Sequence, residues 1–246
     1  MNKNVKMIVM DLDDTLLNDD LVISDYTKQV ISNAQRSGIK IVIASGRPTP
    51  AILPYAEELR LADYNGYVIS YNGAIAHRCD TNEEIFRCTL TWDNIDLLTS
   101  VYKEKSAFIH TYIDDRVVTP EHNPHTDFEG QLTGMPVVKV DDFRAQIQQE
   151  VVKILLLEEP TRLKQIEVEL RPLIGDTMSM NISKPFFLEF TNKRVDKSKT
   201  IDFLCGLENI NKQDVMAIGD SYNDITMIRD CGLGVAMLNG PMDVKK

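Results

Sequence analysis

The chain has 246 residues, 43% of them hydrophobic, which is enough for one large domain or two modest ones with separate cores. Its formal net charge of -10 argues against nucleic acid and anionic membrane surfaces as partners, because both are negatively charged. The four cysteines show no CxxC spacing, no segment reaches membrane-spanning length, and residues 1–6 lack the apolar core of a signal peptide. We therefore expect a cytoplasmic protein with reduced thiols, monomeric or weakly dimeric.

The first predicted strand, at residues 5–10, is apolar and is followed at once by Asp11 and Asp13. Alternate residues of an extended segment point the same way, so both carboxylates can face one crevice while Leu12 points into the core. Two such carboxylates repel each other, and one pKa rises unless a cation lies between them. The pattern therefore predicts a Mg²⁺ site, and the alternative interpretation is a solvated acidic turn.

The next segments alternate between helix and strand. Ser24 can cap a helix that ends near Ser37, a strand is expected at 39–44, a helix at 49–59 and a strand at 67–70. Ser45 and Gly46 follow the second strand, either as a plain turn or as part of a site. This alternation predicts a doubly wound parallel sheet.

The pattern changes after Ala74. Strands are expected at 75–79, 85–90, 107–113, 116–119, 136–140 and 152–158, and helices at 92–105, 143–150 and 161–175. Hairpins and longer strands indicate an antiparallel sheet. We predict an inserted α+β lid (cap) at residues 81–185 that controls access and selectivity, with the core formed by residues 1–80 and 186–246.

Three histidines of this lid invite a functional interpretation. His110 lies between apolar residues of one strand face and is interpreted as a packing residue. His122 and His125 lie in a proline-containing stretch without the spacing of zinc ligands, which favours a mobile surface or substrate-facing loop.

The parallel pattern returns after the lid. Expected elements are a strand at 186–190, a basic loop at 193–199, a helix from Ser198 or Lys199 to Cys205 that stops at Gly206, a strand at 215–218, a helix through residues 225–228 that stops at Gly232, and a strand at 233–237.

Polar groups follow several of these strands: Asp11 with Asp13, then Ser45, Lys197, and Asp220 with Asp224. Ligands bind at the carboxyl ends of strands in such sheets, so these groups can converge on one site. Mg²⁺ held by carboxylates, with a lysine and a hydroxyl opposite, suits a phosphoryl group and its transition-state charge. With Asp as nucleophile the reaction passes through an aspartyl-phosphate.

The same residues resemble the haloacid dehalogenase superfamily, specifically the Cof-type sugar-phosphate phosphatases with a type IIB lid. The resemblance covers nearly the whole chain and rests on five motifs: Asp11-Leu-Asp13-Asp-Thr15-Leu-Leu17, Ile43-Ala-Ser45-Gly46-Arg47, Tyr71-Asn72-Gly73-Ala74, Lys197, and Gly219-Asp220-Ser-Tyr-Asn223-Asp224. It implies an α/β fold, with a doubly wound parallel-sheet core and an inserted cap.

The resemblance also implies residue roles. Asp11 would be nucleophile and metal ligand, while Asp13 would be the acid and base and give its backbone carbonyl to the metal. Asp220 would ligate Mg²⁺, with Asp224 as ligand or support. The implied phosphate-binding positions are Leu12, Ser45, Gly46, Lys197 and Asn223, and the implied substrate contacts are Arg47 and Asn72. Arg47 could instead pair with a carboxylate.

An acid at position 13 points to a phosphatase or phosphomutase of small phosphorylated metabolites, because related ATPases and dehalogenases lack it. Two features depart from the family pattern. Ser198 stands where the family commonly has glycine, and we interpret this serine as a helix N-cap. The sequence stops at Lys246, where related proteins usually continue into another helix and strand. The sequence therefore does not predict how the edge of the core is formed.

Two non-enzymatic alternatives are weaker. A phospho-aspartate receiver domain needs an aspartate at the end of its third strand, and residues 69–73 contain none. A non-catalytic phosphosugar-binding protein has no need for Asp13 and Asp220 together. The number and order of the motifs favour a hydrolase.

Overall fold

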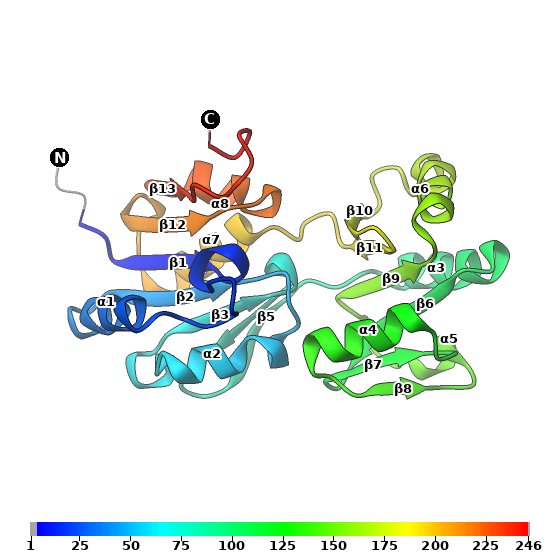
Figure 1. The fold of residues 1–246 in the computed structure, drawn as a ribbon, viewed down its shortest axis with the longest axis horizontal. Helices are drawn as coiled ribbons and strands as arrows, with labels where there is room; N and C mark the ends of the chain where they lie inside the picture. Colours follow the sequence, from blue (N-terminus) through cyan, green and yellow to red (C-terminus); the bar gives the residue numbers. More distant parts are fainter. Residues whose placement is uncertain (1–3, 246) are drawn as a thin grey trace. The chain divides into compact units, whose positions relative to one another are not determined.

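The computed structural model describes residues 4–245, which form two compact units (Figure 1). The first unit contains the chain up to Arg87 and again from Val195, and the second is Cys88–Arg194. The predicted lid, residues 81–185, therefore differs from this division at both ends. The expectation about the edge of the core depended on the end of the sequence at Lys246, and Lys246 lies outside the described residues.

The first unit contains a sheet with strand order β13-β12-β1-β2-β3-β4-β5. The parallel strands are β1 Met7–Asp11, β2 Lys40–Ala44, β3 Tyr67–Ser70, β12 Val215–Gly219 and β13 Leu233–Ala236, and the antiparallel strands are β4 Ile75–Arg78 and β5 Glu83–Arg87. The doubly wound parallel sheet is confirmed. The strands expected at 75–79 and 85–90 extend this sheet, because the turn after β3 folds the chain back against it.

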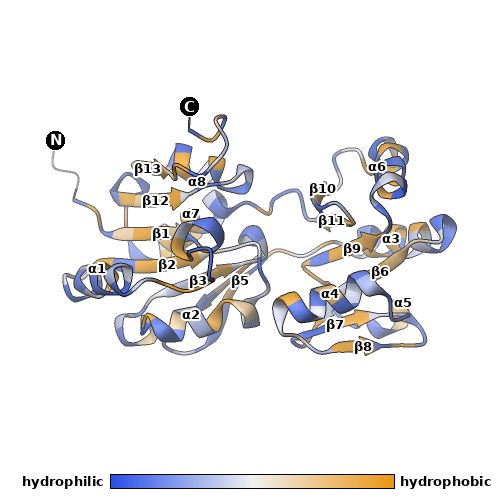
Figure 2. Ribbon diagram, in the orientation of Figure 1, coloured by the Kyte–Doolittle hydropathy of each residue, from blue (hydrophilic) through white to orange (hydrophobic). Residues whose placement is uncertain are grey.

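Helices cover both faces of the sheet. Helices α1 (Asp25–Arg36) and α2 (Leu53–Glu58) pack on one face, and α7 (Lys197–Glu208) and α8 (Ile225–Asp230) pack on the other. Figure 2 shows that hydrophobic residues concentrate on the strands between them. The helix expected at 49–59 is interrupted: a 3₁₀ turn, Thr49–Ala51, precedes α2.

The shorter elements are the turn Leu12–Leu16 and the 3₁₀ segments Leu61–Tyr64, Tyr71–Gly73, Lys212–Asp214 and Tyr222–Asp224.

Helix ends follow local chemistry. The Ser24 hydroxyl accepts a hydrogen bond from the Thr27 amide at 3.1 Å and caps α1, as predicted. Helix α7 differs from the prediction, because Asp196 caps it and it continues through Gly206 to Glu208.

Ser198 is therefore not a cap. It is buried within α7, where its hydroxyl donates to Asp230 at 2.9 Å and accepts from Lys212 at 2.8 Å. The serine that departs from the family pattern thus joins α7 to α8 and to the segment before β12.

The second unit contains a sheet with strand order β10-β11-β9-β6-β7-β8, mostly antiparallel. Its strands are β6 Phe108–Ile113, β7 Arg116–Thr119, β8 Val137–Lys139, β9 Lys153–Leu157, β10 Ser179–Lys184 and β11 Phe187–Thr191. Helices α3 (Trp92–Lys105), α5 (Phe143–Gln146) and α6 (Pro160–Ile174) share its main hydrophobic core. Side chains of α4 (Pro124–Thr133) contact His110 and Tyr112 on β6 instead.

Two expectations in this region were wrong. The strand expected at 186–190 belongs to this sheet, where β11 pairs with β9 and β10, rather than to the core. The stretch with His122 and His125 is not a loop throughout, because Asn123 caps α4 and Pro124 suits its first turn. Strand β10 was missed, although its polar residues alternate with apolar ones as expected of a strand at the edge of a sheet.

His110 is confirmed as a packing residue. Its ring is fully buried beside Tyr112 and Phe187, and its Nδ1 lies 3.2 Å from the Thr126 hydroxyl. Burial lowers the pKa of this histidine to about 3, and the nearby Lys153 charge adds to the shift. The four cysteines form no disulfide bond. No helix in the described part of the chain is long and apolar enough to cross a membrane.

Candidate active site

The carboxyl ends of the parallel strands carry the predicted polar residues of the first unit. Asp11 is the last residue of β1, Ser45 follows β2, and Asp220 follows β12. Lys197 is the first residue of α7. Parallel strands end at a common edge, so residues far apart in the sequence meet there.

Lys197 is the buried cation of this edge. Its Nζ donates to Asp11 Oδ1 at 2.5 Å and to Asp224 Oδ1 at 2.7 Å. Burial opposes its charge, but the two carboxylates outweigh burial and raise the pKa of Lys197. Lys197 therefore stays charged, whereas the Lys193 and Lys199 side chains lie at the exposed surface.

Three carboxylates crowd around this lysine. Among the described residues, Asp11, Asp220 and Asp224 form the group able to hold a metal ion, with one oxygen of each within 4.8 Å of the others. Burial raises the pKa of Asp11 to about 7, against the Lys197 charge, and Asp224 and Asp220 add to the shift. Burial also raises the pKa of Asp220. One carboxylate with a raised pKa was expected from the repulsion of Asp11 and Asp13. Asp11 has this raised pKa, but the carboxylates close to it are Asp220 and Asp224, which follow β12.

Asp224 has both oxygens occupied. Oδ1 accepts from Lys197, and Oδ2 accepts from the backbone amides of Asp220 and Ser221 at 3.1 and 3.0 Å. Gly219 permits this arrangement, because a Cβ there would lie 2.6 Å from the Asp224 side chain. Asp224 therefore orders both the lysine and the turn that carries Asp220.

Asp13 lies apart from the group of three carboxylates and is half-exposed. Arg47 binds it with two hydrogen bonds, Nε to Oδ2 at 3.0 Å and Nη2 to Oδ1 at 2.5 Å. Burial opposes the Arg47 charge, but this pairing outweighs it and raises the pKa of the guanidinium. Of the two interpretations of Arg47, the structure shows pairing with a carboxylate. Leu12, between the two aspartates, is buried in the core as predicted.

Ser45, Gly46, Asn72 and Asn223 form the other side of the edge. Ser45 is buried, and its hydroxyl accepts from the Arg47 amide at 3.1 Å. The backbone amide of Asn72 donates to the Ser45 carbonyl at 3.0 Å. The Asn72 side chain lies beside Gly46. The side-chain amide of Asn223 donates to Asn72 Oδ1 at 2.9 Å. The turn after β3 is thereby joined to two other turns.

One contact of the site was not predicted. The Thr15 hydroxyl donates to Asp220 Oδ1 at 2.9 Å and so links the turn after β1 to the turn after β12. Thr15 belongs to the first acidic motif, but its role depends on a partner 205 positions away. Only its place in that motif could have drawn attention to it.

A buried lysine among carboxylates, at the carboxyl edge of a doubly wound sheet, defines an α/β enzyme equipped for phosphoryl chemistry. Residues 8–246 match the haloacid dehalogenase-like hydrolase family. The chain belongs to this family, as a Cof-type phosphatase of the haloacid dehalogenase superfamily.

Similar proteins support this assignment. YxeH of Bacillus subtilis is 31% identical over 97% of this chain and 89% of its own length. The 5-amino-6-(5-phospho-D-ribitylamino)uracil phosphatase YcsE of the same organism is 29% identical over 99% and 88%. A haloacid dehalogenase-like hydrolase from Bacteroides thetaiotaomicron superposes with a TM-score of 0.91, at 33% identity and 98% and 91% coverage. The subclass IIB sugar phosphatase BT4131 gives 0.81, at 25% identity and 98% and 90% coverage.

Proposed function

We propose that this phosphatase is Mg²⁺-dependent and hydrolyses small phosphorylated metabolites, sugar phosphates foremost, through an aspartyl-phosphate on Asp11. The observation that carries the proposal is the group of Asp11, Asp220 and Asp224 around the buried Lys197. One lysine charge is too little for three carboxylates packed so closely, and a divalent cation would offset the remainder.

The donor set fits Mg²⁺, which prefers oxygen ligands and binds through few carboxylates plus substrate phosphate oxygens. Asp11 and Asp220 are the carboxylates we assign as ligands, with the Asp13 backbone carbonyl. Asp224 supports them, because its oxygens already accept three hydrogen bonds. When bound, the ion would neutralise charge on the phosphoryl oxygens.

In the first half-reaction an Asp11 carboxylate oxygen attacks phosphorus and the bond from phosphorus to the leaving oxygen breaks. Asp13 gives its proton to that oxygen, so the product leaves as an alcohol. Arg47 binds Asp13 as a carboxylate. Asp13 must therefore loosen this pairing to carry the proton.

In the second half-reaction the Asp13 carboxylate takes a proton from water, and the water oxygen attacks the phosphorus of the aspartyl-phosphate. The bond from phosphorus to the Asp11 oxygen breaks, inorganic phosphate leaves, and both aspartates regain their starting state. Lys197, the Ser45 hydroxyl, the Asn223 amide and the backbone amides of Leu12 and Gly46 are the donors we assign to the phosphoryl oxygens.

Metal removal tests the cofactor. Full chelation is expected to abolish hydrolysis of an aryl phosphate, and excess Mg²⁺ is expected to restore it, because the carboxylates alone repel the phosphoryl group. Released phosphate is measured before and after dialysis, with Ca²⁺ as a control ion of the same charge. Undiminished activity after chelation would refute the metal assignment.

Asp13→Asn tests the acid. The variant keeps the backbone carbonyl but cannot donate a carboxyl proton, so it should lose about 10²- to 10⁴-fold in kcat on an alkyl phosphate. The first half-reaction of a nitrophenyl phosphate should suffer much less, because its leaving group needs no proton. The nitrophenol burst in pre-steady-state measurements reports that step. Equal losses in this step for good and poor leaving groups would remove the acid role from Asp13.

A panel of phosphorylated metabolites tests the substrate class. We assign the second unit to the cap that selects the leaving group, because all the proposed phosphoryl-handling residues lie in the first unit. Sugar phosphates are expected to give the highest kcat/KM, with free inorganic phosphate as product. A phosphomutase would instead return an isomeric sugar phosphate and little inorganic phosphate.

A further inference from the structure

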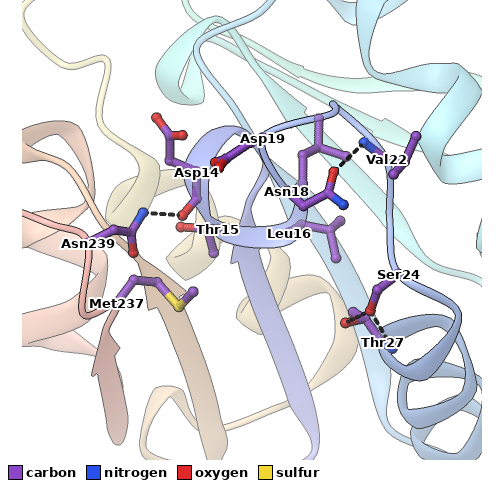
Figure 3. A pocket seen from close by; sticks show the side chains of 11 residues that line it. Asp14, Thr15, Leu16, Asn18, Asp19, Val22, Ser24, Thr27, Met237 and Asn239 are labelled. Atoms are coloured by element: carbon purple, nitrogen blue, oxygen red, sulfur yellow. Dashed lines mark hydrogen bonds between the residues drawn. The ribbon is translucent and has the colours of Figure 1, made fainter.

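Residues 237–240, which follow β13 and are called the clasp below, contact the turns that carry the acidic residues. The Met237 amide donates to the Gly219 carbonyl at 2.9 Å, so the clasp begins beside the end of β12. The Asn239 side-chain amide then donates to the Asp14 carbonyl at 2.7 Å (Figure 3). One short segment therefore joins the turn after β1 to the turn after β12.

Asp14 is a sensitive point for such a contact. Its backbone is left-handed, with φ 58° and ψ 6°, which non-glycine residues seldom adopt. The preceding residue, Asp13, is extended, with φ -75° and ψ 134°. The chain thus changes direction immediately after the proposed acid. The hydrogen bond from Asn239 to the Asp14 carbonyl therefore lies at the point where the chain changes direction.

Gly240 is buried against the other turn. A Cβ at this position would lie 2.3 Å from the Asp220 carbonyl oxygen, much closer than van der Waals contact. The obstacle is backbone, so the clash could be relieved only by moving one of the two segments. Glycine therefore lets the clasp approach the residue that we assign as a metal ligand.

A pocket of about 330 Å³ lies beside these contacts. Figure 3 shows Leu16, Asn18 and Val22 lining it together with Met237 and Asn239. The pocket is lined by residues of both the clasp and the turn after β1.

We propose that the clasp is a positioning element of the phosphatase site, with Asn239 orienting Asp13 through the Asp14 carbonyl and Gly240 placing the Asp220 turn. The proposal rests on the proposed function, since it assigns the acid role to Asp13 and metal binding to Asp220. Neither residue of the clasp needs to touch the substrate.

Asn239→Ala and Asn239→Asp test the first half of the proposal. Both remove the amide donor, and the second keeps the size of the side chain. A lost hydrogen bond of this kind corresponds to about 3- to 10-fold. We expect that decrease in kcat on an alkyl phosphate, less than about 2-fold in the nitrophenol burst rate, and an unchanged KM. Leu238→Ala is the matched control, because that neighbouring side chain is 92% exposed, and it should change neither rate.

Gly240→Ala tests the second half through metal binding. Changes in the groups that support a metal ligand typically weaken affinity about 10- to 100-fold, and we expect a loss in that range for Mg²⁺ measured by titration calorimetry. Asn239→Ala should change Mg²⁺ affinity less than about 2-fold. If Gly240→Ala does not fold, the role of Gly240 in placing the Asp220 turn is withdrawn, and the Asn239 variants decide the role of Asn239.

The outcomes separate the two proposals. Leaving-group dependence in Asp13→Asn but not in the Asn239 variants would overturn the positioning role and leave the proposed function intact. Equal losses on both substrates for the Asn239 variants, or an unchanged Mg²⁺ affinity in a folded Gly240→Ala, would also overturn it. No leaving-group dependence in Asp13→Asn would refute the acid role and the clasp proposal together.

Discussion

Asp11→Asn is expected to abolish turnover, with a loss of at least about 10⁴-fold in kcat, because an amide oxygen cannot serve as the nucleophile of an aspartyl-phosphate mechanism. The change keeps the shape of the side chain and an acceptor for Lys197. Released phosphate, measured with saturating substrate and Mg²⁺, reports the loss.

The folding control for this variant has a defined sign. The pKa of Asp11 is raised to about 7 in the folded chain, so the fold favours the protonated form and the charged form costs stability as the pH rises above the unfolded value. A neutral residue of the same shape removes that cost. Without metal at pH 8, Asp11→Asn should melt no lower than the parent protein. Retained turnover in a folded, pure variant would contradict the nucleophile assignment.

Lys197→Ala is expected to lower kcat by about 10²- to 10³-fold, the usual cost of losing one preorganised donor to a developing charge. Lys193→Ala and Lys199→Ala are the matched controls, because both lysines are exposed and should change kcat less than about 2-fold. The reverse ranking would show that another lysine of this loop meets the phosphate.

Lys197→Ala should also destabilise the first unit. It leaves the buried carboxylates of Asp11 and Asp224 without their cation, and breaking a buried ion pair typically costs about 3–5 kcal/mol. Activity is therefore measured at a temperature where circular dichroism shows the variant folded. A melting temperature equal to that of the parent would mean that the two carboxylates need no counter-charge.

The sequence alone predicted the five parallel strands of the core sheet and named most residues of the candidate site. The strands that end at Asp11, Ala44 and Gly219 are apolar runs followed at once by polar residues, and such a local pattern needs no tertiary information. The cap on α1 was predictable for the same reason, since Ser24 bonds a backbone amide three residues away.

Pairing partners were decided by the tertiary structure. The residues of a strand do not specify which sheet the strand joins, so β5 was expected in the lid and β11 in the core. Helix α4 was hidden by a proline that reads as a loop residue but suits a first helical turn.

The sequence by itself determined which side chains stand at the carboxyl edge of the sheet, because local hydrophobic pattern specifies where each strand ends. Only the tertiary structure decided how they pair: Lys197 with Asp11 and Asp224, Arg47 with Asp13, Thr15 with Asp220, and Asn239 with the Asp14 carbonyl. These contacts join turns that are distant in the chain. Their physical origin is the packing of parallel strands side by side, which sets distances that no local pattern contains.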